Sequence, residues 1–68
     1  MTIKQKVSRN LELLIIKKKI NNISEFCRRN NIDKKLLYQW LNMDVLPSLT
    51  NACKLAKAFD VTIDDLVR

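Results

Sequence analysis

The chain has 68 residues, of which 47% are hydrophobic and 29% are charged, and its formal net charge is +6. This length allows one small core, so we expect a single domain over residues 1–68. No apolar run approaches the roughly 18 residues of a membrane-spanning helix, and no apolar secretion-signal segment follows Met1. These features exclude a membrane-spanning class and predict a cytoplasmic protein.

Histidine is absent, and the only cysteines are Cys27 and Cys53. Two separated thiols make neither a disulfide scaffold nor a zinc site, so we expect no metal and no cofactor. We interpret both as small buried apolar residues, with a redox role as the alternative. Glycine-rich phosphate loops are absent as well, and neither thiol has an evident base partner, so we expect no enzymatic activity.

The positive charge is concentrated in the first part of the chain. Residues 1–43 contain ten Lys or Arg and three Asp or Glu, a net charge of +7, whereas residues 44–68 contain three and four, a net charge of −1. A basic surface attracts phosphate polyanions or acidic membranes, and an ordinary solvated surface explains the charge equally well. Charge alone therefore does not identify the partner.

Helix starts are marked by side chains that can cap free backbone amides. The five candidate N-caps are Thr2, Asn22, Asp33, Ser48 and Thr62. They predict five helices, over about residues 3–19, 23–30, 34–42 and 49–58 and a short one after Thr62. The fold class is therefore all-α.

Each predicted helix has an apolar stripe on one side, as a small helical bundle requires. In the 3–19 helix the stripe is Ile3, Val7, Leu11 and Leu14. The later helices are expected to bury Ile23, Phe26, Cys27, Leu37, Trp40, Leu41, Leu49, Ala52, Cys53, Ala56, Phe59, Ile63, Leu66 and Val67. We assign Trp40 to the core and not to a surface that stacks on single-stranded bases, because such surfaces need several exposed aromatic residues.

Only three residues, 31–33, separate the second predicted helix from the third. So short a connection makes the helices cross steeply, which is the geometry of a helix-turn-helix motif. Asn31 lies where the turn needs a left-handed residue, a conformation that Asn tolerates well. Ile32 is expected to fill the corner of the core beneath the turn.

From Ile20 onward the chain resembles the lambda-repressor-like, Cro/CI-type (Xre) family of helix-turn-helix DNA-binding proteins. The resemblance rests on an ordered set of segments: Glu25-Phe26-Cys27, Ile32-Asp33, the helix of 34–41, Pro47-Ser48-Leu49, Leu55-Ala56-Lys57-Ala58-Phe59 and 61–66. It implies a compact five-helix lambda-repressor-like bundle whose second and third helices form the motif. It also implies a transcriptional regulator, a repressor or Cro-like switch protein, that binds double-stranded DNA.

The chain departs from the family pattern in three places. The Gln that commonly opens the second helix and anchors a phosphate is displaced around Asn22, so either Asn22 substitutes for it or the contact is absent. Met43 stands where Gly usually follows the recognition helix. The basic loop beyond that position is here Asp44-Val45-Leu46, which should bind backbone phosphate poorly; either other basic groups compensate or the affinity for DNA is modest.

Site residues follow from the resemblance, position by position. The resemblance implies that base edges meet Lys34, Lys35, Leu36, Tyr38 and Gln39, through contacts of the kind that Lys makes with guanine, Gln with adenine and apolar groups with thymine methyls. Phosphate contacts are expected from Lys17, Lys18, Lys19, Asn22, Arg28, Arg29 and Asn42. An ordinary solvated surface remains the alternative for the Lys34–Lys35 pair and for the two arginines.

One recognition helix covers too few base pairs to select a site in a genome, so we expect a homodimer on a palindromic operator. The candidates for the dimer interface are Val45, Leu46, Val61, Ile63 and Val67. The two apolar loop residues, Val45 and Leu46, also support an alternative, a protein-interaction module such as an antitoxin or antirepressor. We expect no small-molecule ligand and no membrane partner.

Overall fold

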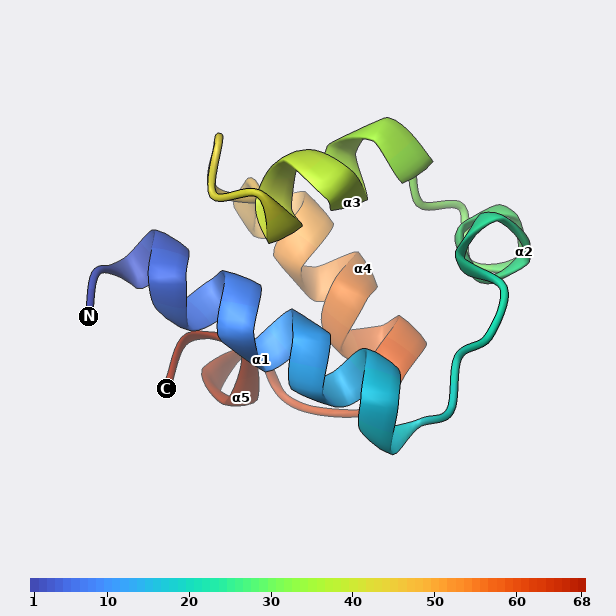
Figure 1. The fold of residues 1–68 in the computed structure, drawn as a ribbon, viewed down its shortest axis with the longest axis horizontal. Coiled ribbons are helices and arrows are strands. Elements are labelled where there is room, and N and C mark those ends of the chain that lie inside the picture. Colours follow the sequence, from blue (N-terminus) through green and yellow to red (C-terminus); the bar gives the residue numbers. More distant parts are fainter.

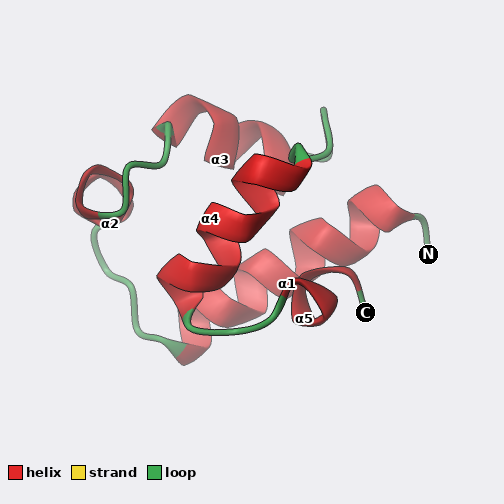
Figure 2. Cartoon of the chain, turned by 180° about the vertical axis from the view of Figure 1, so that it is seen from behind, coloured by secondary structure: helices red, strands yellow, loops and turns green.

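A computed structural model describes residues 1–68, and it contains five helices and no strand (Figures 1 and 2). They are α1 (Ile3–Lys17), α2 (Ile23–Arg29), α3 (Lys34–Leu41), α4 (Leu49–Phe59) and α5 (Ile63–Val67). The predicted all-α, five-helix class is therefore confirmed. None of the five helices combines the length and the hydropathy that crossing a membrane requires.

All five predicted N-caps are confirmed. The side chains of Thr2, Asn22, Asp33, Ser48 and Thr62 each accept a hydrogen bond from a backbone N–H in the first turn of their helix. Thr2 with Gln5, and Thr62 with Asp65, form complete reciprocal capping boxes. These bonds satisfy amides that no helix can satisfy internally, so the caps fix where each helix begins.

The first four helices end in the same left-handed turn, although the chain has no glycine. Lys19, Asn31, Met43 and Asp60 have φ of 56°, 56°, 64° and 58°. In each case two backbone bonds close the last turn; after α3, for example, the N–H of Met43 donates to the carbonyl of Trp40 and that of Asp44 to the carbonyl of Gln39. This is the Schellman arrangement, and a side chain at its left-handed position costs about 1 kcal/mol.

That turn explains the largest error in the predicted boundaries. We predicted that the first helix runs to residue 19, but α1 ends at Lys17 because Lys19 is left-handed. The apolar stripe and the lysines that follow it have no feature that marks such a turn. The other predicted ends lie within one residue of the observed ones.

One core holds the helices together. Its ten buried apolar residues are Val7, Leu11, Cys27, Ile32, Leu37, Trp40, Leu55, Ala56, Phe59 and Leu66. The rings of Phe26 and Phe59 lie 4.8 Å apart between their centroids and join α2 to α4. Two side chains of α1 tie distant segments to this core: Ser8 Oγ donates to the carbonyl of Leu41, and Asn10 Nδ2 to the carbonyl of Leu66.

Three residues that we assigned to the core are exposed, so these assignments were wrong. Ile3 and Leu49 lie in the first turns of α1 and α4, and Leu49 is 74% exposed. Cys53 is exposed because α4 buries a face centred on Leu55 and Phe59. The spacing of apolar residues identifies which side of a helix faces the core. It does not show which turns on that side are covered by other helices.

Candidate nucleic-acid interface

The connection between α2 and α3 has the geometry of a helix-turn-helix. In Figure 1, α2 is viewed almost end-on, whereas α3 lies across the page, so the two helices cross steeply. Asn31 adopts the predicted left-handed conformation, and Ile32 is buried beneath the turn, as predicted. The turn therefore locks the angle between the two helices, because its apolar residue belongs to the shared core.

Helix α3 has a buried face and an exposed face. Leu37 and Trp40 are buried, as predicted, and hold the helix against the rest of the bundle. Lys34, Lys35 and Tyr38 are exposed. The other two predicted base-contacting residues, Leu36 and Gln39, are half-buried, and Leu36 packs against the core.

One hydrogen bond links the beginnings of the two motif helices. Lys34 Nζ donates to Ser24 Oγ on α2 at 2.9 Å. Both side chains are exposed, so the bond lies on the surface of the motif. Ser24 was missed by sequence reasoning, because a serine in the first turn of a helix is an ordinary polar residue until the crossing of the helices brings it beside Lys34.

The predicted phosphate-contacting residues are all exposed: Lys17, Lys18, Lys19, Asn22, Arg28, Arg29 and Asn42. Three of them follow one another at the end of α1, and two form the last turn of α2. The side-chain oxygen of Asn22 accepts the N–H of Glu25 at 3.0 Å, which leaves its amide nitrogen as the group that can donate to a phosphate.

The family model that describes the Cro/C1-type HTH DNA-binding domain matches residues 10–68. The chain belongs to this family. The match spans all of α2 to α5 and the second half of α1, and it confirms the family predicted from the sequence. Searches of curated proteins and of solved structures found no significant match.

In this Cro/C1-type domain, the segment that follows α3 is apolar and exposed. Met43, Val45 and Leu46 all expose their side chains, and so does Leu49 at the start of α4. Met43 occupies a left-handed position, a conformation that glycine adopts without steric cost. Lys4 Nζ approaches the backbone carbonyl of Asp44 at 3.4 Å, so the beginning of α1 lies beside this segment.

The five predicted dimer-interface residues fall into two groups. Val45 and Leu46 are exposed. Val61, Ile63 and Val67 are half-buried and pack against the core, so they offer less apolar surface to a partner. Leu49, which the apolar stripe of its helix placed in the core, is more exposed than any of these five residues.

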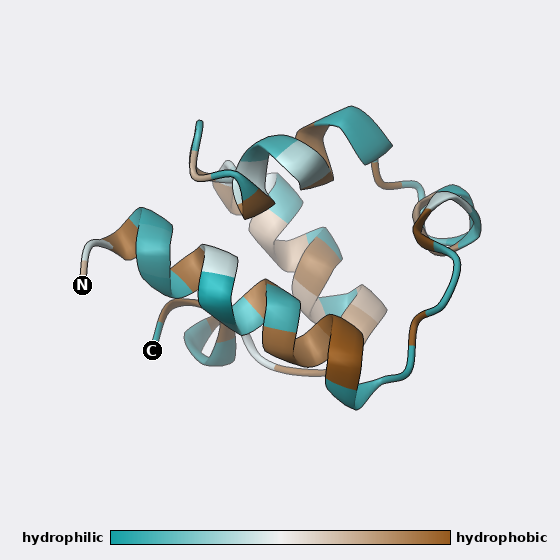
Figure 3. Cartoon of the chain, viewed as in Figure 1, coloured by the Kyte–Doolittle hydropathy of each residue, from teal (hydrophilic) through white to brown (hydrophobic).

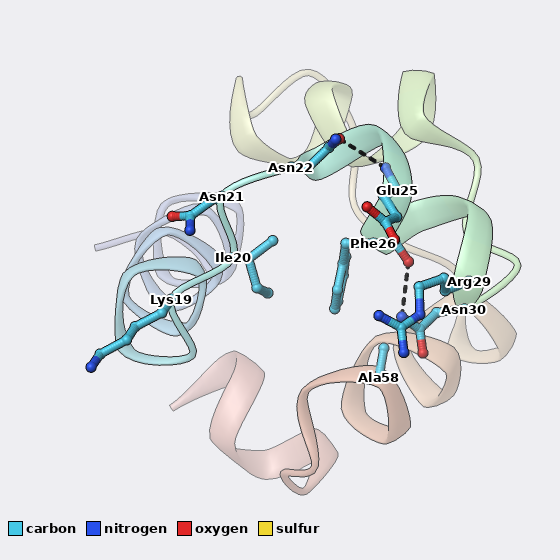
Figure 4. A pocket seen from close by; sticks show the side chains of 9 residues that line it. All are labelled: Lys19, Ile20, Asn21, Asn22, Glu25, Phe26, Arg29, Asn30 and Ala58. Carbon is cyan, nitrogen blue, oxygen red and sulfur yellow. Dashed lines mark hydrogen bonds between the residues drawn. The ribbon is translucent and has the colours of Figure 1, made fainter.

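A hollow of about 600 Å³ opens between the end of α1, α2 and α4 (Figure 4). Ile20 and Phe26 face each other across it, and Ala58 lies below them. Two of its polar side chains already make hydrogen bonds: the side-chain oxygen of Asn22 caps α2, and Asn30 Nδ2 donates to the carbonyl of Phe26. No buried side-chain polar atom in the chain lacks a hydrogen-bond partner, so we assign no ligand to this hollow.

The two thiols differ in their surroundings. Burial raises the pKa of the Cys27 thiol, an effect that the positive charge of Lys34 opposes and the negative charge of Asp33 reinforces. Cys27 is therefore a protonated core residue at neutral pH, as predicted, and only Cys53 is exposed to reagents in solution.

Proposed function

We propose that this protein is a sequence-specific transcriptional regulator, a repressor or Cro-like switch protein, that reads the major groove of double-stranded DNA with α3. The observation that carries the proposal is the two-sided character of α3. Leu37 and Trp40 anchor it in the core, while Lys34, Lys35 and Tyr38 project from its other side. The major groove is wide enough to admit a helix, and its base edges present hydrogen-bond acceptors. A helix that is anchored on one side and carries long side chains with hydrogen-bond donors on the other side fits this groove.

Individual roles follow from side-chain chemistry. Lys35 can donate to the O6 and N7 acceptors of guanine, and Gln39 can pair with adenine through two hydrogen bonds. Lys34 shares its ammonium with Ser24, which holds the side chain at the start of α3. Since an ammonium has three donors, Lys34 can keep this bond and still donate to a base or a phosphate.

The basic residues at the end of α1 and on α2 supply the contacts that do not depend on sequence. Lys17, Lys18, Lys19, Arg28 and Arg29 are all exposed, and each phosphate that they neutralise releases counterions from the DNA. These contacts fix the register of the protein on the duplex. The role requires neither catalysis nor a cofactor.

We further propose that the chain binds as a homodimer to a palindromic operator. One α3 covers only a few base pairs, and a twofold symmetric pair doubles both the bases read and the phosphates neutralised. The half-sites would then lie about one helical turn apart.

Selection of bound sequences from a random duplex pool tests this proposal. We expect a preferred site made of two inverted half-sites, with an affinity that falls steeply as salt increases. Recovery of no preferred sequence would contradict sequence-specific reading. Recovery of a single unrepeated half-site would contradict the homodimer.

The second candidate function is a protein-interaction module such as an antitoxin or antirepressor. The exposed apolar side chains of Val45 and Leu46 favour it, because the corresponding loop of a DNA-binding relative is expected to be basic. Binding through an apolar interface responds weakly to salt. Loss of the steep salt dependence in the same experiment would therefore favour this candidate.

A further inference from the structure

The second half of α1 carries apolar side chains on its solvent side as well as on its core side. Leu11 is buried, whereas Leu13 and Ile16 are 53% and 73% exposed. Figure 3 shows this half of the helix largely in the brown of hydrophobic residues. A helix on the surface of a small bundle needs apolar residues only where it faces the core, so folding does not explain the exposed pair.

A second, smaller hollow adjoins the exposed pair. Lys19 is left-handed, so the chain turns back at the end of α1, and the N–H of Ile20 donates to the carbonyl of Ile15. Beside this closed turn lies a hollow of about 400 Å³, lined by Ile15, Ile16, Lys19, Ile20 and Asn21. Three of these five side chains are apolar, so the hollow can receive an apolar side chain of a partner.

Three consecutive cations border the exposed pair and the hollow. Lys17, Lys18 and Lys19 are all exposed, and together with Leu13 and Ile16 we call them the 13–19 surface. The one ion pair of the chain joins Arg68 to Asp64, so none of the three lysines has an ionic partner within the chain. The only acidic residue of α1 is Glu12, and the positive charge of the surface therefore gathers at its lysine end.

We propose that the 13–19 surface binds an acidic amphipathic segment of another protein. Apolar side chains of the segment would cover Leu13 and Ile16 and enter the hollow, while its carboxylates would lie against the lysines. Such a contact combines burial of apolar surface with complementary charge. The inference goes beyond the proposed function, because the second half of α1 lies on the side of the molecule away from α3 (Figures 1 and 2).

Other occupants suit this surface less well. Phosphates of DNA can pair with the lysines, but they leave Leu13 and Ile16 in water, so an acidic partner would compete with DNA for the lysines only. A second copy of the chain would bring six lysines together in a twofold contact, since each copy contributes three. Attachment to an acidic membrane increases with the apolar area buried, and two exposed apolar side chains provide little.

Selection from a displayed library of random peptides tests the inference on the folded parent chain. We expect the enriched peptides to combine Asp or Glu with Leu, Ile or Phe, and their affinity to fall as salt increases. Ile16→Ser should weaken their binding at least about tenfold, as the loss of a buried isoleucine would. Leu49→Ser is the matched control, because Leu49 and Ile16 are 74% and 73% exposed, and it should bind like the parent. Circular dichroism checks that both variants fold.

A second pair of variants tests the role of charge. Lys18→Ala and Arg28→Ala each remove one cation from an exposed position. Lys18→Ala should weaken binding of a labelled enriched peptide about two- to fivefold, the range of an exposed ion pair. Arg28→Ala, on α2, should leave this binding unchanged. Fluorescence anisotropy measures both affinities.

Enrichment of no acidic peptide, or an equal loss of binding in Ile16→Ser and Leu49→Ser, would overturn the inference. Vesicles of phosphatidylcholine with and without phosphatidylserine give the membrane comparison. If the parent chain bound the anionic vesicles more tightly than any enriched peptide, and Ile16→Ser abolished that binding, the surface would belong to a membrane and the inference would be wrong. A parent chain that binds the peptides through Ile16 but binds no duplex would refute the proposed function and leave the 13–19 surface intact.

Discussion

The two parts of the helix-turn-helix region differ in charge and in surface character. The end of α1, α2 and the first turn of α3 carry Lys17, Lys18, Lys19, Arg28, Arg29, Lys34 and Lys35, all exposed. The rest of α3 and the connection to α4 carry no cation and expose apolar side chains instead. The first part therefore has the charge that phosphate contacts require, whereas the second part offers apolar side chains and no cation.

Trp40 belongs to the core that holds both parts in place. Its replacement should therefore give the largest effect, a loss of stability. Trp40→Ala deletes a buried side chain of the core and should cost about 3–5 kcal/mol of unfolding free energy. For a domain of this size, such a loss unfolds much of the population. Urea denaturation followed by circular dichroism measures it, with exposed Tyr38→Ala as the control that should leave stability nearly unchanged. A stable Trp40→Ala variant would contradict the assigned core.

Gln39→Ala should separate base reading from phosphate contact. It should cost about 1–3 kcal/mol on the preferred duplex and relax the preference at one base position. Arg28→Ala, the control from the basic part, should weaken binding to all duplexes alike. Fluorescence anisotropy on specific and random duplexes distinguishes the two patterns, and a uniform loss for Gln39→Ala would refute direct reading by this residue.

Glycine at two left-handed positions should sharpen the comparison. Lys19 in the basic part and Met43 after α3 both have a φ near 60°. Lys19→Gly and Met43→Gly remove the steric cost that a side chain has in this conformation, so each should stabilise the fold by about 1 kcal/mol. Thermal unfolding measures this gain. A destabilised variant would show that the left-handed turn is not a source of strain.

Thiol labelling should give the smallest effect, a difference between two cysteines in the same chain. The raised pKa of Cys27 keeps its thiol protonated at neutral pH, and burial shields it. Since the thiolate is the reactive form, a maleimide should modify Cys53 first, as mass spectrometry of peptides would show. Modification of folded Cys27 at the rate of Cys53 would contradict its burial.

Local signals in the sequence predicted much of this fold. The caps marked every helix start, because a cap depends on residues only three positions apart, and Asn31 and Ile32 marked the turn. The exposure of Leu49 and Cys53 could not be predicted in the same way, because it depends on which neighbours α4 meets in space. The bond between Lys34 and Ser24 was missed for the same reason.

The roles of the site residues stay predictions, and the structure shows only which of these residues are exposed. The exposed face of α3 and the basic residues on α1 and α2 follow from helical position alone. Among the exposed apolar residues after α3, only Val45 and Leu46 were predicted to be available to a partner, whereas Leu49 was predicted to be buried. The contact of Lys4 with the carbonyl of Asp44 could not be predicted, because 40 residues separate the two along the chain.

The central claim is that two copies of this chain read one duplex through α3 and neutralise phosphates with the basic part. Sedimentation of the parent chain with the selected palindromic duplex, repeated over a range of salt concentrations, tests it most directly. The account predicts two chains per duplex and an affinity that falls linearly in log K against log salt, with a slope that reflects several phosphate contacts. One chain per duplex at saturation, or an affinity that does not change with salt, would contradict it.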